Sequence, residues 1–201
     1  MLHCRKDTVG VIQLSLSSIG LFLASVILLT VVFAVVFSND WHRTAELESL
    51  ASDFSNLLSD VDTLFFESEH SFHLPEKSYV YRVFLSTEYI ALSTQGSWDT
   101  SLFKTKRLLI TIWPRLPTQN WTTGADLHSY LNVTYGHKGV IDDPISSENF
   151  TRVLEELTGT VPYFALQPFE ILIRKPIILE KVIVYYEPGM NHDFLLLYQK
   201  I

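Results

Sequence analysis

The sequence contains a single cysteine, Cys4, which lies close to the N-terminus. No disulfide can therefore form within the rest of the chain, and packing alone has to stabilise it. The sequence also lacks a nucleophile elbow, a glycine-rich phosphate loop and a zinc-protease helix. We therefore expect no enzymatic activity and no cofactor. A membrane-tethered enzyme is kept only as an alternative that a polar pocket in the folded domain would revive.

Basic residues are in the minority. The 201 residues include 15 Lys and Arg against 22 Asp and Glu, which gives a net charge of −7. From Asn39 onward the imbalance is 13 basic against 21 acidic residues. Such a surface repels phosphate backbones, so we exclude nucleic acid as a partner. Hydrophobic residues make up 47% and aromatic residues 13% of the chain, which argues against disorder.

Charge is absent altogether between Asp7 and Asp40, and residues 9–37 are dominated by Val, Leu, Ile, Phe and Ala. A helix needs roughly 20 apolar residues to cross a bilayer, and this run exceeds that length. It is also far longer than the core of a cleaved secretory signal. We therefore predict a retained transmembrane helix at residues 9–37, after a basic tail at residues 1–8, with membrane lipid as a partner.

The short N-terminal side carries two basic residues, Arg5 and Lys6, whereas Asp40, Arg43, Glu46 and Glu48 follow the run. An excess of Lys and Arg marks the cytoplasmic side of a span. We expect a cell-membrane protein with a cytoplasmic N-terminus and an extracytoplasmic C-terminal domain.

Three small residues in the run, Ser17, Gly20 and Ala24, lie on one stripe of the predicted helix. This spacing lets two membrane helices approach closely. The stripe is a candidate packing surface for other membrane-helix subunits, although small residues are common in any span.

Proline and glycine are absent between Gly20 and Pro75. Beyond Trp41, apolar residues recur at steps of three and four, which is typical of an amphipathic helix. We expect this helix at residues 38–70, continuous with the span, and the unbroken rod from about residue 9 to 66 would be roughly 85 Å long at 1.5 Å per residue. It would form the spine of the outer domain; a parallel coiled coil is the alternative.

Pro75 begins a region of a different periodicity. Runs of β-branched and aromatic residues predict strands, and two polar-capped segments predict short helices. The fold class is α+β: a long N-terminal helix packed against a mostly antiparallel, β-rich domain at residues 75–201. The expected strands are residues 79–85, 89–92, 107–113, 169–173, 177–186 and 194–198, and the expected helices are 123–131, capped by Thr123, and 148–157, starting at Ser146 or Ser147.

Several polar side chains are candidates for metal-binding or modification sites. His70 and His73, with Glu67, would share a helix face if the helix continued that far, but exposed polar residues are the simpler interpretation, so we predict no metal site. Lys104, Lys106 and Arg107 form a basic cluster, interpreted as a solvated strand edge. Three outward-facing sequons are candidate N-glycosylation sites: Asn120, Asn132 and Asn149.

About the first 70 residues share one layout, in which a basic pair and an acidic residue lead directly into a long apolar helix. The residues at this junction are Arg5, Lys6, Asp7, Thr8, Val9, Gly10, Val11 and Ile12. In this layout the chain resembles type IV pilin-like proteins, of the kind archaea use for pili and archaellum filaments. The resemblance implies a peptidase cut between Asp7 and Thr8 that leaves the apolar helix attached. It also implies an accessory subunit rather than a major one.

Two main hypotheses follow. In the first, the protein is a pilin-like structural or assembly subunit of a filament or secretion-type complex. In the second, the helix only anchors an outer domain that binds a partner or a ligand, neither of which the sequence identifies.

Overall fold

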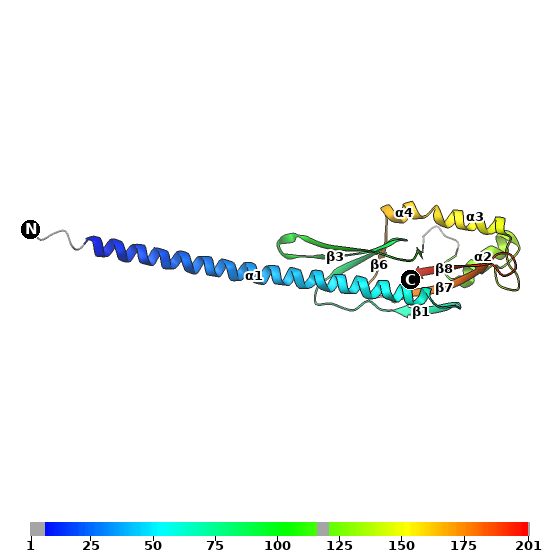
Figure 1. Ribbon diagram of the computed structural model, residues 1–201, viewed down its shortest axis with the longest axis horizontal. Helices are drawn as coiled ribbons and strands as arrows, with labels where there is room; N and C mark the ends of the chain where they lie inside the picture. The colour runs from blue at the N-terminus through cyan, green and yellow to red at the C-terminus, as the bar shows by residue number, and fades with distance from the viewer. Residues whose placement is uncertain (1–6, 116–120, 201) are drawn as a thin grey trace, which may run out of the picture.

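The computed structural model describes residues 7–115 and 121–200. Its dominant element is helix α1, Asp7–Asp62, whose 56 residues correspond to about 84 Å at 1.5 Å per residue. The N-terminal half of α1 projects away from the rest of the chain, and the C-terminal half runs alongside two sheets (Figure 1). The expected continuous rod is therefore confirmed over these residues. We call residues 63–200 the head, and residues 47–61 of α1, which the head covers, the spine.

The head contains two four-stranded sheets. The first has the order β1-β7-β8-β5, and all of its pairings are antiparallel except that of β5 with β8. The second has the order β4-β3-β2-β6 and is antiparallel throughout. The strands are β1 Ser68–Phe72, β2 Tyr81–Leu85, β3 Tyr89–Gln95, β4 Ser101–Arg107, β5 Ile112–Pro114, β6 Phe169–Ile171, β7 Ile177–Tyr185 and β8 Asn191–Tyr198.

The main core lies between the spine and both sheets. Side chains on one face of β7 and β8, such as Leu179 and Leu197, join Val83 and Leu92 of the second sheet around the spine. The spine supplies six buried residues at the predicted spacing: Leu47, Leu50, Ala51, Phe54, Leu58 and Val61. Each of the five larger side chains, all but Ala51, contributes about 1.5–3 kcal/mol on burial. The apolar face is thus covered within the same chain, as the spine hypothesis requires.

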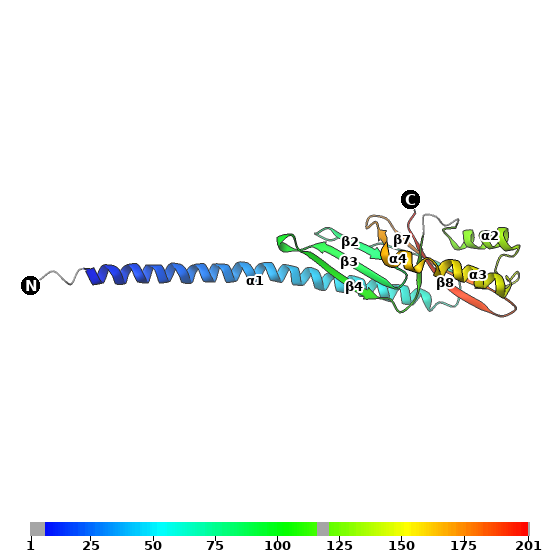
Figure 2. The ribbon, with the colours of Figure 1, turned by 90° about the horizontal axis from the view of Figure 1, so that it is seen from above.

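The opposite face of the first sheet is covered by helices α2, Gly124–Tyr135, and α3, Ser147–Thr158, at the far end of the head (Figure 2). Thr123 caps α2 with its hydroxyl, 3.1 Å from the Asp126 backbone nitrogen, and the Asp126 carboxylate accepts in return from the Thr123 N–H. These backbone bonds lower the pKa of Asp126. Ser146 caps α3. Both helices and both caps were expected from sequence, and the α+β fold class is confirmed; the six-residue helix α4, Val161–Leu166, was not expected.

The predicted end of the spine helix is wrong. The helix was expected to reach residue 70, but it ends at Asp62, and β1 follows within the first sheet. The physical cause is a contact from a distant strand: the buried Lys181 ammonium of β7 donates to the Asp62 carbonyl. A cation at this position also stabilises the negative end of the helix dipole. Phe65, an apolar residue within the range predicted to be helical, is 97% exposed.

The strand expected at residues 107–113 is also wrong as a single element. The chain leaves the second sheet after Arg107, the last residue of β4, and enters the first sheet at Ile112, the start of β5. Backbone bonds hold the crossing, from the Leu108 N–H to the Glu88 carbonyl and from the Ile112 N–H to the Thr87 carbonyl. Of the expected strand, only Arg107 lies in β4 and only Ile112 and Trp113 lie in β5, and residues 108–111 form the connection between the two sheets.

Candidate functional site: the exposed half of the long helix and its junction with the head

The most apolar part of α1 has no cover within the described residues. Residues 19–37, which we call the apolar segment, span about 29 Å, close to the roughly 30 Å of a bilayer core. Among the described helices, α1 is the one long and apolar enough to cross a membrane, and none of its most apolar stretch is buried. The exposed side chains are Ile19, Leu21, Phe22, Leu23, Val26, Ile27, Leu28, Leu29, Val31, Val32, Phe33, Val35 and Phe37.

The hydroxyl groups within the apolar segment are satisfied by the helix itself. The Ser25 hydroxyl donates to the Leu21 carbonyl and the Thr30 hydroxyl to the Val26 carbonyl, both at 2.8 Å. An unpaired hydroxyl would be costly in an apolar medium, whereas these two are already paired. The apolar segment can therefore enter hydrocarbon without leaving either hydroxyl group unpaired.

Polar contacts between α1 and the head begin directly after the apolar segment. The Asp40 carboxylate accepts from the backbone N–H of Ser97 at 3.0 Å and from its hydroxyl at 2.9 Å. Arg43 donates to the Gln95 carbonyl at 2.9 Å. Ser97 lies in the 3-10 helix η1, Ser97–Asp99, at the turn between β3 and β4. Trp41 remains 69% exposed beside these contacts.

Further along α1, strand β4 is bound to the helix by its lysines. Lys104 pairs with Glu48 at 3.1 Å, and the Lys106 ammonium donates to the Ser52 hydroxyl at 3.0 Å. The expected strand edge is confirmed, since β4 is an edge strand of the second sheet, but its two lysines contact α1 and are not merely solvated. Their contacts fix the helix and the second sheet in one register, since both elements advance in the same direction.

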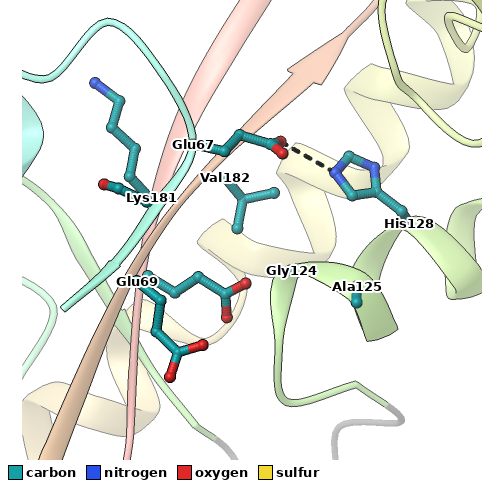
Figure 3. A pocket seen from close by; sticks show the side chains of 9 residues that line it. Glu67, Glu69, Gly124, Ala125, His128, Lys181 and Val182 are labelled. Carbon is teal, nitrogen blue, oxygen red and sulfur yellow. Dashed lines mark hydrogen bonds and ion pairs between the residues drawn. The ribbon is translucent and has the colours of Figure 1, made fainter. Parts of the chain in front are cut away.

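A second group of polar contacts was missed by sequence reasoning. An open hollow of about 360 Å³ lies between β1, β7 and the start of α2, and Glu67 and His128 point toward one another at its rim (Figure 3). Glu67 Oε1 lies 3.2 Å from His128 Nε2 and accepts from the Ile183 N–H at 3.0 Å. His128 Nδ1 lies 2.7 Å from the Lys138 carbonyl.

The hollow is lined by residues from β1, β7 and α2. Glu69 of β1 lies directly opposite Glu180 of β7, and like charges in this position are unfavourable. Gly124 is required by close packing, because a Cβ there would lie 2.6 Å from a Val182 methyl group. No group of three or more His, Cys, Asp or Glu able to hold a metal ion occurs among the residues that the structure describes.

The candidate sites from sequence are scattered along the fold. Helix α1 begins at Asp7, followed by Thr8, and the side chains of both, like that of Ser17, lie outside the described part. Gly20 and Ala24 are exposed, with open space where a Gly20 side chain would extend.

The sequons and the histidines differ in placement. Asn132 is exposed on α2, Asn149 is half-buried in the first turn of α3, and Asn120 lies outside the described residues. The proposed grouping of His70 and His73 with Glu67 on a helix face is wrong, because His70 lies in β1 and Glu67 bonds His128 instead.

No family model matches this chain, and comparisons with curated proteins and with solved structures give no match.

Proposed function

We propose that this protein is a single-pass membrane protein that acts as a pilin-like structural or assembly subunit of a filament or secretion-type complex. The observation that carries the proposal is the division of one unbroken helix into a fully exposed apolar segment and a buried spine. The apolar segment is stable when it is surrounded by lipid or by other apolar helices, whereas the spine is stabilised by the head that covers it.

The charge distribution supports one orientation. Two basic residues, Arg5 and Lys6, precede the span, whereas a single one, Arg43, follows it closely, together with Asp40, Glu46 and Glu48. By the positive-inside rule, the N-terminus is cytoplasmic and the head lies on the outer side. Asn132 would then be accessible to glycosylation on that side.

Assembly through the span is supported by its surface. The exposed small residues Gly20 and Ala24 leave room for the backbone of a second helix. The N-terminal layout around Asp7 and Thr8 resembles that of proteins which are trimmed and then packed side by side. A subunit of this kind leaves the bilayer only when neighbouring spans replace the lipid.

The decisive measurement is the N-terminal mass of the protein taken from native membranes. A mature chain that begins at Thr8 supports a pilin-like subunit. An intact N-terminus contradicts trimming and favours the alternative, a membrane-anchored binding domain that does not assemble.

Self-association can be tested in detergent with a matched pair of variants. Gly20→Leu fills the small-residue stripe, whereas Phe22→Leu alters a position about 200° around the same helix. We expect Gly20→Leu alone to reduce the oligomer size measured by light scattering. Equal sizes for both variants and the wild type would remove the stripe as an interface.

A further inference from the structure

The turn between β3 and β4, residues 95–101, lies beside the end of the apolar segment. Asp40 binds Ser97 and Arg43 binds the Gln95 carbonyl, so the turn is fixed to α1 from two sides. Both helix residues follow Phe37, the last residue of the apolar segment, by only a few positions.

The helix rise places this turn within the polar surface layer of a bilayer. Asp40 is three residues beyond Phe37, or about 4.5 Å along the axis at 1.5 Å per residue. The headgroup layer is about 5–7 Å thick on each side of the hydrocarbon core. Because Ser97 lies 2.9–3.2 Å from the Asp40 carboxylate, it falls in the same layer as Asp40.

We propose that this turn is a second membrane contact, which seats the head directly on the lipid headgroups. The inference rests on the proposed function, since it assumes that the apolar segment spans the bilayer. It goes beyond anchoring because it assigns a surface of the head, and hence a fixed orientation of the head, to the membrane.

The chemistry of the turn suits headgroups rather than hydrocarbon. Ser101 is an exposed hydroxyl residue, the exposed Thr100 hydroxyl donates to the Ser97 carbonyl and can still accept, and the exposed Asp99 carboxylate accepts from the Gln95 side chain. Hydroxyl groups and a carboxylate can bond the phosphate and the ammonium of a zwitterionic lipid. Val80, 83% exposed, reaches the same end of the head, where the Thr94 hydroxyl donates to its carbonyl.

Strand β4 provides two label positions at different distances from the membrane. It runs from Ser101 at the turn to Arg107, and its contacts with Glu48 and Ser52 advance along α1 away from the apolar segment. Six steps of about 3.4 Å separate the two ends by about 20 Å. Ser101 therefore lies at the membrane surface and Arg107 lies well above it, and both side chains are exposed.

The full chain, with Cys4→Ser as background, is placed in phosphatidylcholine vesicles that contain lipid with a nitroxide on the headgroup. A fluorophore is attached at His42→Cys, Ser101→Cys or Arg107→Cys in turn; His42 is exposed on α1 at the junction. We expect quenching at positions 42 and 101 to agree within about twofold, and position 107 to remain unquenched. Ser101 pairs with Gln95, which binds Arg43, so it lies level with His42, about 7.5 Å beyond Phe37 at the outer edge of the headgroup layer.

Each other pattern overturns the inference in a distinct way. Quenching at position 42 alone means that the head stands off the membrane, and the anchor is retained. Quenching at all three positions means that the head lies flat on the lipid, with β4 parallel to the surface. No quenching at any position means that the bilayer does not end near Phe37, so the proposed membrane function fails together with the inference.

Discussion

Phe54→Ala is the sharpest test of the spine as part of the core. Phe54 is fully buried between α1 and the sheets, and its ring centroid lies 5.8 Å from that of Phe72 in β1. A buried Phe→Ala change costs about 3–5 kcal/mol, and loss of an aromatic pair adds to the upper part of that range. We expect the free energy of unfolding of the head to fall by about 4 kcal/mol.

The measurement is urea unfolding of the full chain in detergent micelles, followed by the fluorescence of Trp113 and Trp121, which are buried in the head. Phe65→Ala is the matched control, because Phe65 is 97% exposed, and we expect a change below about 0.5 kcal/mol. If the two variants unfold within about 1 kcal/mol of each other, residues 47–61 do not form the core of the head.

Two further perturbations address polar groups of the head. Lys181→Met removes a cation, 3% exposed, that lies 2.7 Å from the Asp193 carboxylate. We expect a loss of about 2 kcal/mol in the free energy of unfolding in the same urea assay, below the full cost of a broken buried pair because Asp193 is 40% exposed to water. Asp193→Asn should cost less, and an unchanged stability of Lys181→Met would show that packing of the side-chain stem is sufficient. Burial raises the pKa of Tyr81 and Tyr130 to about 12, so the neutral phenols stabilise the fold fully below about pH 10, and this stability is lost as pH rises toward 12. Phenolate absorbance for these two residues should therefore rise together with tryptophan exposure, and their titration near pH 10 in a folded head would contradict this reasoning.

Local sequence signals predicted the elements whose cause is local. The steps of three and four in the spine identified its buried face, and Thr123 and Ser146 marked the starts of α2 and α3. The end of α1 could not be predicted, because it depends on Lys181, which lies 119 residues away from Asp62 in the chain. Helical periodicity therefore appeared to continue into residues that form β1.

In the candidate site, too, one part could be predicted from local sequence and another part could not. The apolar segment was evident from composition, whereas its junction with the head depends on a turn that comes far later in the sequence than Asp40. The hollow at Glu67 and His128 joins β1, β7 and α2. The start of β1 was expected to be part of the spine helix, so no spacing rule could have found the hollow. The cut after Asp7, the stripe at Gly20 and the occupancy of the sequons stay predictions.

The spine and β8 lie far apart in the sequence, and this has a consequence for biogenesis. In the proposed orientation, Leu47 to Val61 cross the membrane before Leu195 and Leu197, which cover them. Until β8 has followed, the emerging chain presents an uncovered apolar stripe, which is vulnerable to proteases and to aggregation. A truncation that removes only β8 should therefore leave an inserted anchor carrying an unfinished, degradable product rather than a smaller working domain.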